Sequence, residues 1–355
     1  MTTYFDLVQD EEFRDFVEKR LSSGTNNTTY SFEKEKPKLY KYQPLSYYAV
    51  ENIINGKLTA TRIGEFNDLF DGAIHCYGSK EEIDEAAEAK WDELKSLMTS
   101  VNSSGDLIDH DYYVGLYRDH FKTDSRLKFR QLDYLGTFAI CLSSKNDSTL
   151  MWSHYANSNT GMCVEYDFNS VQVKPLQRNM IFPVAYSSVP VFVKDLIEDE
   201  KSAICKFPID TAVLCTALNK ADVWKYENEW RLVLVLPYEK EMSRRIQIIV
   251  PKPSKIILGY HFLKNFFYHD SKNDKELIEA KNNIENSKRL LDYVKINQIP
   301  ISITIPMVGG YKVTQKNTTV EEISSLIDYH FEDDEPENIR YYYVVHDEMM
   351  DMLNL

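Results

Sequence analysis

The chain has 355 residues, of which 43% are hydrophobic and 27% are charged, a composition that supports a folded core and argues against intrinsic disorder. Acidic residues outnumber basic residues by 55 to 41, and the net charge of −14 at pH 7 argues against a surface that follows nucleic-acid phosphates along its length. The five cysteines form no C-x-x-C pair, and neither an export signal nor a membrane-spanning apolar run occurs, so we expect a cytoplasmic protein with reduced thiols.

The first part of the chain predicts helices around two short strands. Apolar residues at helical spacing predict a helix over 5–21, and the polar stretch 22–29 predicts a linker. Strands are expected at LYKYQP and LTATRI, with a short helix between them that Ser46 caps. A charged helix over 80–101 and a second helical region over 106–133 follow, and we expect them to cover one side of a sheet and to present a solvated face.

From residue 136 onwards the sequence is dominated by strands. Helices are predicted between them at 148–157, 193–219 and 273–296, in an order that lacks a regular strand–helix alternation. The sequence therefore predicts an α+β fold with a mixed, largely antiparallel sheet. Many of the predicted strands are apolar on both faces, which is typical of strands covered on both sides; the set is GTFAICLSS, GMCVEYDF, FPVAYSSV, EWRLVLVLP, IQIIVP, KIILGYHF and ISITIP.

These elements divide the chain into three predicted regions. An N-terminal helix and linker occupy 1–30, a core domain occupies 31–308, and a C-terminal extension occupies 309–355. The extension carries a predicted helix over 320–331 and the strand-like stretch IRYYYVV. All of the candidate functional residues lie in the predicted core domain.

Several common enzyme motifs are absent from the sequence. It contains no G-x-G-x-x-G, no G-x-x-x-x-G-K-[ST], no H-E-x-x-H and no G-x-S-x-G, which argues against Rossmann enzymes, P-loop enzymes and common hydrolases. Three other stretches mix aromatic and small polar residues beside predicted strand ends, as a ligand cleft does. They are LYKYQP, EFNDLFDG and CLSSKNDSTLMWSHYANSNTGMCVEYDF.

Two carboxylates, Glu227 and Glu229, open the stretch KYENEWRLVLVLP. Period-two alternation places them and Arg231 on one face of a strand whose remainder is buried. Two interpretations stay open. Either the pair is the solvated start of a strand, with Glu229 paired to Arg231, or it is a catalytic pair.

Four motifs can be read along the chain: LYKY at 39–42, FND.FD at 66–71, CLSS.ND..LMWSHYA....GMCVEYD at 141–167 and W..ENEWR at 224–231. This set, which anchors residues 39–262, resembles the bacterial domain of unknown function 2971 family. Leu69 replaces the more usual proline of the second motif. A family without an assigned function implies no mechanism.

Three of the strand motifs, LYKY, AICLSS and ENEWR, also follow each other in an order that is similar to that of ADP-ribosyltransferases. This more distant resemblance implies a sheet core of the ADP-ribosyltransferase fold with helical insertions. It implies NAD as the substrate, with transfer of ADP-ribose to an acceptor or hydrolysis of NAD, as in a toxin or antiphage effector. Such enzymes use a carboxylate because their transition state resembles an oxocarbenium ion.

The resemblance implies a role for each matching residue. Glu229 would hold the ribose 2′-hydroxyl and stabilise positive charge as nicotinamide leaves, and Glu227 would orient the acceptor. Lys41 occupies the position that binds a phosphate or ribose, where the family usually has Arg, His or Tyr. Ser143 would brace the site.

Aromatic and polar residues complete the predicted NAD-binding set. Tyr40 and Tyr42 are expected to stack on nicotinamide or adenine. Trp152 and Tyr155 lie on a predicted short helix. Their aromatic side chains either pack within the fold or stack on a base of NAD. Asn67 lies in a predicted turn, where its side chain either bonds its own backbone or contacts substrate.

Two other classes of function stay open. A metal-dependent nuclease would gather Asp147, Glu165 and Asp167 at strand ends around Mg²⁺, whereas the NAD hypothesis needs no metal. A non-catalytic binding or adaptor protein would present an acidic, tyrosine-rich surface to a protein partner. The acceptor of an ADP-ribosyltransferase, whether protein, nucleic acid or water, also stays open.

Overall fold

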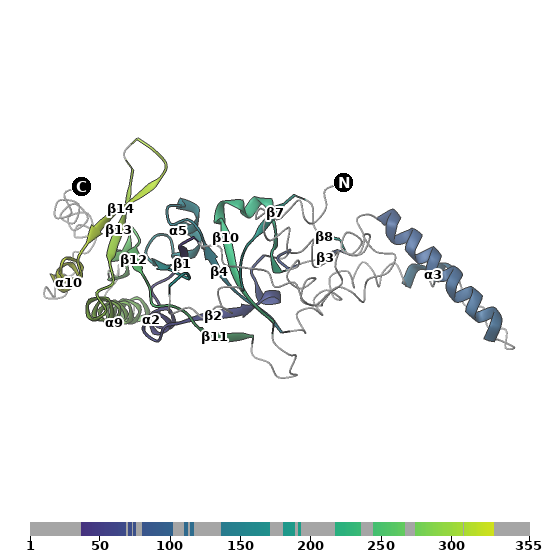
Figure 1. The fold of residues 1–355 in the computed structure, drawn as a ribbon, viewed down its shortest axis with the longest axis horizontal. Helices are drawn as coiled ribbons and strands as arrows, with labels where there is room; N and C mark the ends of the chain where they lie inside the picture. The colour runs from purple at the N-terminus through teal and green to yellow at the C-terminus, as the bar shows by residue number, and fades with distance from the viewer. Residues whose placement is uncertain are drawn as a thin grey trace.

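Figure 1 shows the fold in a computed structural model of the chain. The structure describes residues 37–68, 70–72, 74–75, 80–101, 110–112, 114–116, 136–170, 180–188, 191–192, 217–235, 244–266, 274–307 and 309–329. Four predicted elements lie wholly or mostly outside the described residues: the N-terminal helix and linker over 1–30, the helical region over 106–133, the helix over 193–219 and the strand IRYYYVV.

A ten-stranded sheet forms the centre of the molecule. Its strands are β1 (Leu39–Gln43), β2 (Lys57–Arg62), β4 (Thr137–Ser143), β5 (Met162–Tyr166), β6 (Ile181–Pro183), β10 (Glu229–Val235), β11 (Arg245–Ile249), β12 (Lys255–Leu258), β13 (Ile301–Pro306) and β14 (Val313–Thr318). The order is β11-β2-β4-β1-β5-β12-β13-β14, with β10 paired to β4 and β6 paired to β10. Within this sheet β12 and β13 are parallel and the other pairs are antiparallel. The predicted α+β class with a mixed, largely antiparallel sheet is confirmed.

Strand β4 joins the two halves of this sheet. It pairs with β10 along its whole length. Its other edge pairs with β2 near its start and with β1 at Ser143, its last residue. Six of the seven β4 residues are buried, as expected for a strand that is covered on both faces.

Helices α2 (Tyr47–Ile54), α9 (Asp274–Ile296) and α10 (Val320–Tyr329) cover one face of the sheet (Figure 1). Their buried side chains, among them Val50, Leu290 and Ile323, join the main hydrophobic core with residues of the sheet strands. The predicted cap is present, since the Ser46 hydroxyl accepts a hydrogen bond from the backbone N–H of Ala49.

The short helix α5 (Thr149–Tyr155) belongs to a second, smaller core. Its Trp152 is buried with Tyr42 of β1, Cys163 of β5 and Ile257 of β12. Ser148 caps this helix by accepting from the backbone N–H of Met151.

Helix α3 (Lys80–Val101) spans the predicted residues but lies at one end of the molecule, away from the ten-stranded sheet (Figure 1). The prediction that it covers one side of the sheet is therefore wrong. Two small parallel sheets complete the described fold: β3 (Ile74–His75) with β8 (Val191–Phe192), and β7 (Ala185–Ser187) with β9 (Asn219–Ala221). The predicted strand FPVAYSSV is thus divided between the central sheet and a small one.

The region after residue 308 continues the same sheet and core. Strand β14 pairs with β13 across six residues, and Ile323 and Ile327 of α10 are buried in the main core. The predicted boundary between 308 and 309 therefore falls within a hairpin. Among the described residues, no helix combines the length and apolar character needed to cross a membrane.

Candidate active site

Three of the sequence motifs meet in one row across adjacent strands. Ser143, at the end of β4, lies opposite Tyr40 of β1 on one side and opposite Glu229 of β10 on the other. These residues are far apart in the sequence, and the central position of β4 brings them together. The row marks the edge of a cavity.

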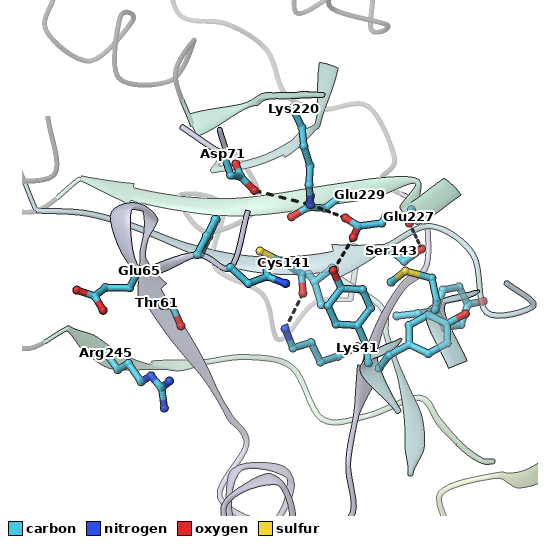
Figure 2. Close-up of a pocket in the computed structure, with 17 residues that line it drawn as sticks. Lys41, Thr61, Glu65, Asp71, Cys141, Ser143, Lys220, Glu227, Glu229 and Arg245 are labelled. Atoms are coloured by element: carbon cyan, nitrogen blue, oxygen red, sulfur yellow. Dashed lines mark hydrogen bonds and ion pairs between the residues drawn. The ribbon is translucent and has the colours of Figure 1, made fainter. Parts of the chain in front are cut away.

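The cavity has a volume of about 450 Å³, within the range of about 300 to 1,000 Å³ that small-molecule sites occupy. Figure 2 shows its lining side chains. They come from β1, β2, β4, α5, β9, β10, β11, the 3₁₀ helices η2 (Ile63–Glu65) and η4 (Asp222–Glu227), and the chain after η2. The lining residues are Tyr40, Lys41, Tyr42, Thr61, Glu65, Phe66, Asn67, Asp71, Cys141, Leu142, Ser143, Met151, Tyr155, Lys220, Glu227, Glu229 and Arg245.

A buried arginine organises the acidic wall of this cavity. Arg231 is fully buried and donates from both terminal nitrogens to the carboxylate of Asp71, each at 2.7 Å. It also chelates Glu229, with Nε at 2.8 Å from Oε1 and Nη2 at 3.0 Å from Oε2. Paired donors of this kind match the fork of the guanidinium to planar carboxylates. The guanidinium also lies over the ring of Phe66, with 5.0 Å between the guanidinium carbon and the ring centroid.

Lys220 links the two glutamates of the sequence motif. Its Nζ lies 2.5 Å from an oxygen of Glu227, 3.0 Å from one of Glu229 and 3.7 Å from one of Asp71. Figure 2 shows Lys220 reaching down between these carboxylates. With Arg231, the cluster holds three carboxylates and two cations.

The two glutamates differ in their tendency to ionise. Burial disfavours the charge of Glu229, but Arg231 and Lys220 outweigh burial and lower its pKa from 4.5 to about 2. For Glu227 burial is the larger effect, and the nearby charge of Glu229 adds to it, so its pKa is raised despite Lys220. Glu229 is thus a fixed charge, whereas Glu227 is poised closer to protonation.

The sequence predicts a strand that already includes Glu227, and this is wrong. Strand β10 begins at Glu229, and Glu227 ends η4. Between them Asn228 adopts a left-handed conformation with φ 45°, which turns the chain. Both carboxylates nevertheless reach Lys220.

The interpretation of the pair as a solvated strand start is also wrong in part. Glu227 and Glu229 are only 3% and 4% exposed. The predicted pairing of Glu229 with Arg231 is present, but it is buried. A buried cluster of this kind is strongly coupled, because charges removed from water interact through a low dielectric.

Ser143 and Tyr155 hold Glu227 in place. The Ser143 hydroxyl donates to the backbone carbonyl of Glu227 at 2.6 Å and accepts from the backbone N–H of Lys145 at 3.1 Å. The Tyr155 hydroxyl donates to the Glu227 carboxylate at 2.6 Å. Ser143 thus braces the segment that carries the glutamate.

Tyr40, Lys41 and Tyr42 of the first motif line the cavity, and each also makes a hydrogen bond within the fold. Lys41 donates to the backbone carbonyl of Cys141 at 2.9 Å. The hydroxyl of Tyr40 donates to Glu165 and that of Tyr42 to the backbone carbonyl of Lys145. Their rings and the lysine stem therefore form fixed walls.

Of the other predicted binding residues, Asn67 and Tyr155 line the cavity and Trp152 does not. Trp152 is fully buried, packs edge-on against Tyr42 with ring centroids 5.2 Å apart, and donates from its indole nitrogen to the backbone carbonyl of Asn146. These contacts favour the packing interpretation for Trp152.

The acidic residues considered for Mg²⁺ do not gather. Glu165 accepts from Lys38, Tyr40 and Ser254. Across the described part of the chain, no group of three or more His, Cys, Asp or Glu side chains is arranged to hold a metal ion. The structure therefore does not bring Asp147, Glu165 and Asp167 together as the nuclease alternative requires.

Sequence reasoning missed two members of the ionic cluster. Asp71 ends the motif FND.FD, so its presence in that motif was a usable signal. Lys220 lies in the stretch NKADVW and carried no such signal, because nothing in local sequence distinguishes a lysine that points inward from one that points to solvent.

Fold and site together define an α+β protein with a small-molecule cavity that is walled on one side by a buried ionic cluster. Residues 151–232 match the model of a family described as "Protein of unknown function (DUF2971)". The matched stretch runs from α5 to β10 and includes Lys220, Glu227, Glu229 and Arg231, so it supports the resemblance to that family seen in the sequence. Neither the curated proteins nor the solved structures contain a match to the chain.

Proposed function

We propose that the chain binds NAD in this cavity, breaks the bond between nicotinamide and ribose, and transfers ADP-ribose to an acceptor or to water. The observation that carries the proposal is the row formed by Tyr40, Ser143 and Glu229 on β1, β4 and β10. The same three motifs carry the resemblance to ADP-ribosyltransferases, and they converge on one cavity. A cytoplasmic toxin or antiphage effector of bacteria is the setting in which we place this activity.

The acidic wall suits the charge that develops in this reaction. The nicotinamide ring of NAD is cationic, and the ribose centre becomes cationic as nicotinamide leaves. Three carboxylates against two cations leave the wall with an excess of negative charge when all are ionised. Charges that are already fixed in a buried site stabilise such a centre without reorganisation at the moment of reaction.

Other residues suit the remaining parts of NAD. In the view of Figure 2, Lys41 and Arg245 lie below the cavity, while Lys220, Glu227 and Glu229 lie above it. Cations on that side would face the pyrophosphate, and the tyrosine rings that line the cavity would contact the nicotinamide or adenine.

Labelled NAD provides the test of this proposal. Pure protein is incubated with NAD and with protein, nucleic-acid or no acceptor, and nicotinamide release and transfer of label are measured. We expect nicotinamide release that depends on the protein, and a melting temperature that NAD raises and Mg²⁺ does not, because a ligand that binds the native state stabilises it. Stabilisation by Mg²⁺ without any effect of NAD would contradict the proposal.

A lysine substitution tests the binding mode. Lys41→Ala should weaken NAD binding about tenfold or more, since it removes a cation from the cavity, while stability falls by only about 1 kcal/mol for the lost hydrogen bond to Cys141. Lys252→Ala is the matched control, because Lys252 also donates to one backbone carbonyl, that of Asn297, but does not line the cavity. Equal NAD affinity in the two variants would show that Lys41 does not face the ligand.

A further inference from the structure

The two carboxylates of the acidic wall are not equivalent in their contacts. Both oxygens of Glu229 accept from Arg231, and one of them also accepts from Lys220. Among the described residues, Glu227 has no arginine partner and is held by Lys220 and the hydroxyl of Tyr155. The resemblance to ADP-ribosyltransferases makes Glu229 the catalytic residue. The contacts instead favour Glu227, because Glu229 is already bound by both Arg231 and Lys220.

A charge count leads to the same distinction. Arg231 is shared between Asp71 and Glu229, which leaves one negative charge in that group of three. Lys220 is shared among all three carboxylates, with its ammonium 2.5 Å from Glu227, 3.0 Å from Glu229 and 3.7 Å from Asp71. Among the described residues, Glu227 thus contacts one cation, which it shares, whereas Glu229 contacts both Lys220 and Arg231.

We propose that Glu227, and not Glu229, is the catalytic carboxylate that opposes the cationic ribose centre, and that Glu229 acts as a positioning residue that fixes Lys220 and Arg231. This inference rests on the proposed function. Lys220 and Tyr155 are positioning residues for Glu227. Because Glu227 is carried by η4 and braced by Ser143, its carboxylate faces the cavity from the end of a 3₁₀ helix and not from strand β10.

The proposed step balances without any further reactant. The bond from ribose C1′ to the nicotinamide nitrogen breaks, its electron pair leaves with nicotinamide, and the positive charge passes from that ring to the ribose. The ionised Glu227 stabilises this centre. An acceptor hydroxyl, amine or water then gives an electron pair to C1′ and loses a proton, which Glu227 accepts and passes to solvent. The products are nicotinamide, the ADP-ribosylated acceptor or ADP-ribose, and one proton.

Matched glutamine variants separate the two carboxylates. Glu227→Gln should lower the kcat of nicotinamide release by about 10² to 10³, the scale for loss of one preorganised electrostatic group, while the NAD concentration that half-saturates the melting shift changes less than about threefold. Glu229→Gln should lower kcat by less than about tenfold per folded molecule. Glu321→Gln is the control, because Glu321 is exposed on α10 and pairs with Lys295.

A second variant decides the question even where Glu229→Gln does not fold. In the described part of the chain, the charged and titratable groups that act on Glu227 include Lys220 of β9, Glu229 of β10, Tyr155 of α5, Tyr186 of β7 and Tyr226 of η4. The Tyr155 hydroxyl favours the ionised carboxylate, so Tyr155→Phe should raise the pKa of Glu227. The acid limb of the kcat/KM profile should then move to higher pH.

The results distinguish failure of this inference from failure of the proposed function. Absence of nicotinamide release by the wild-type chain overturns the proposed function, and this inference with it. Release by the wild type that Glu227→Gln leaves within about threefold, or an acid limb that Tyr155→Phe does not move, overturns only the assignment of Glu227. A loss of kcat in Glu229→Gln that exceeds the loss in Glu227→Gln returns the catalytic role to Glu229.

Discussion

Arg231 is the residue on which the candidate site depends most directly. Its guanidinium is wholly buried, donates to Asp71 and Glu229, and also donates to the backbone carbonyl of Ala217 at 2.7 Å. These hydrogen bonds tie the chain after η2 to β10 and to the residues that precede β9. Because burying these charges is costly unless they are paired, the cluster holds together as a unit.

Loss of the arginine should therefore destabilise the fold. Arg231→Met leaves Asp71 and Glu229 buried without their main partner, and we expect a loss of about 3 to 5 kcal/mol in the free energy of unfolding, measured by urea denaturation. Arg244→Met is the control, because the Arg244 side chain is 77% exposed and its contact with Glu65 is 3.5 Å long. A loss below about 1 kcal/mol in Arg231→Met would show that the cluster is not an energetic unit.

The lowered pKa of Glu229 predicts a specific dependence of stability on pH. Its pKa is about 2 in the folded chain against 4.5 as the reference value. The folded state therefore binds this proton less readily, and the stabilisation is complete above about pH 4.5 and is lost as the pH falls towards 2. Calorimetry should therefore show that the free energies of unfolding of the wild type and of Glu229→Gln, plotted against pH, converge as the pH falls through that window. Curves that stay parallel would contradict the assigned ionisation.

At the scale of elements, the link from α5 to β5 is set by turn geometry and close backbone packing. Asn157, Ser158 and Asn159 all have positive φ, between 47° and 68°, and turn the chain back towards β5. Gly161 and Gly259 lie where backbones approach closely: a Cβ at Gly161 would stand 2.4 Å from the carbonyl oxygen of Gln43. Residues 157–159 and Gly161 are thus explained by turn geometry and packing.

Gly259 offers the sharper test of this packing. A Cβ there would stand 2.1 Å from the carbonyl oxygen of Asn159, so Gly259→Ala forces backbone to move and should cost about 1 to 3 kcal/mol or more of stability. In Gly115→Ala the new Cβ meets nothing within 4 Å, and its helical position makes alanine neutral or stabilising. Thermal unfolding of both variants measures the difference. Equal melting temperatures would mean that the two segments are not in contact.

At the scale of the whole molecule, one core extends from α2 through the sheet to α10. Ile323 and Ile327 of α10 are buried in the same cluster as Leu39 of β1 and Val164 of β5. The C-terminal helix therefore stabilises the sheet that carries the candidate site, although it lies well outside the cavity.

Truncation of a buried isoleucine tests this continuity. Ile323 is fully buried, and Ile323→Ala should lower the free energy of unfolding by about 2 to 5 kcal/mol in a single cooperative transition. Ile296→Ala removes the same atoms from a side chain that is 80% exposed and should change stability by less than about 0.5 kcal/mol. Two separate transitions, with only the later one affected, would show that the C-terminal segment unfolds independently.

The sequence by itself determined the local features of this protein. Consecutive apolar residues identified β4 and β5 as buried strands. Hydroxyl side chains at the starts of α2 and α5 identified their caps. Both features depend on residues that are neighbours in the sequence. The pairing of Glu229 with Arg231 was also accessible, since residues two apart share one face of a strand.

Only the tertiary structure decided how these elements meet. The positions of Asp71 and Lys220 beside Glu229 depend on the order of strands around β4 and on the turn at Asn228, and no local periodicity encodes either. Burial of the carboxylate pair was likewise decided by packing. The same local sequence can begin a strand that is exposed or one that is buried. The fixed charge of Glu229 and the contact of Glu227 with Lys220 depend on a cluster whose contacts join residues as far apart as 160 positions.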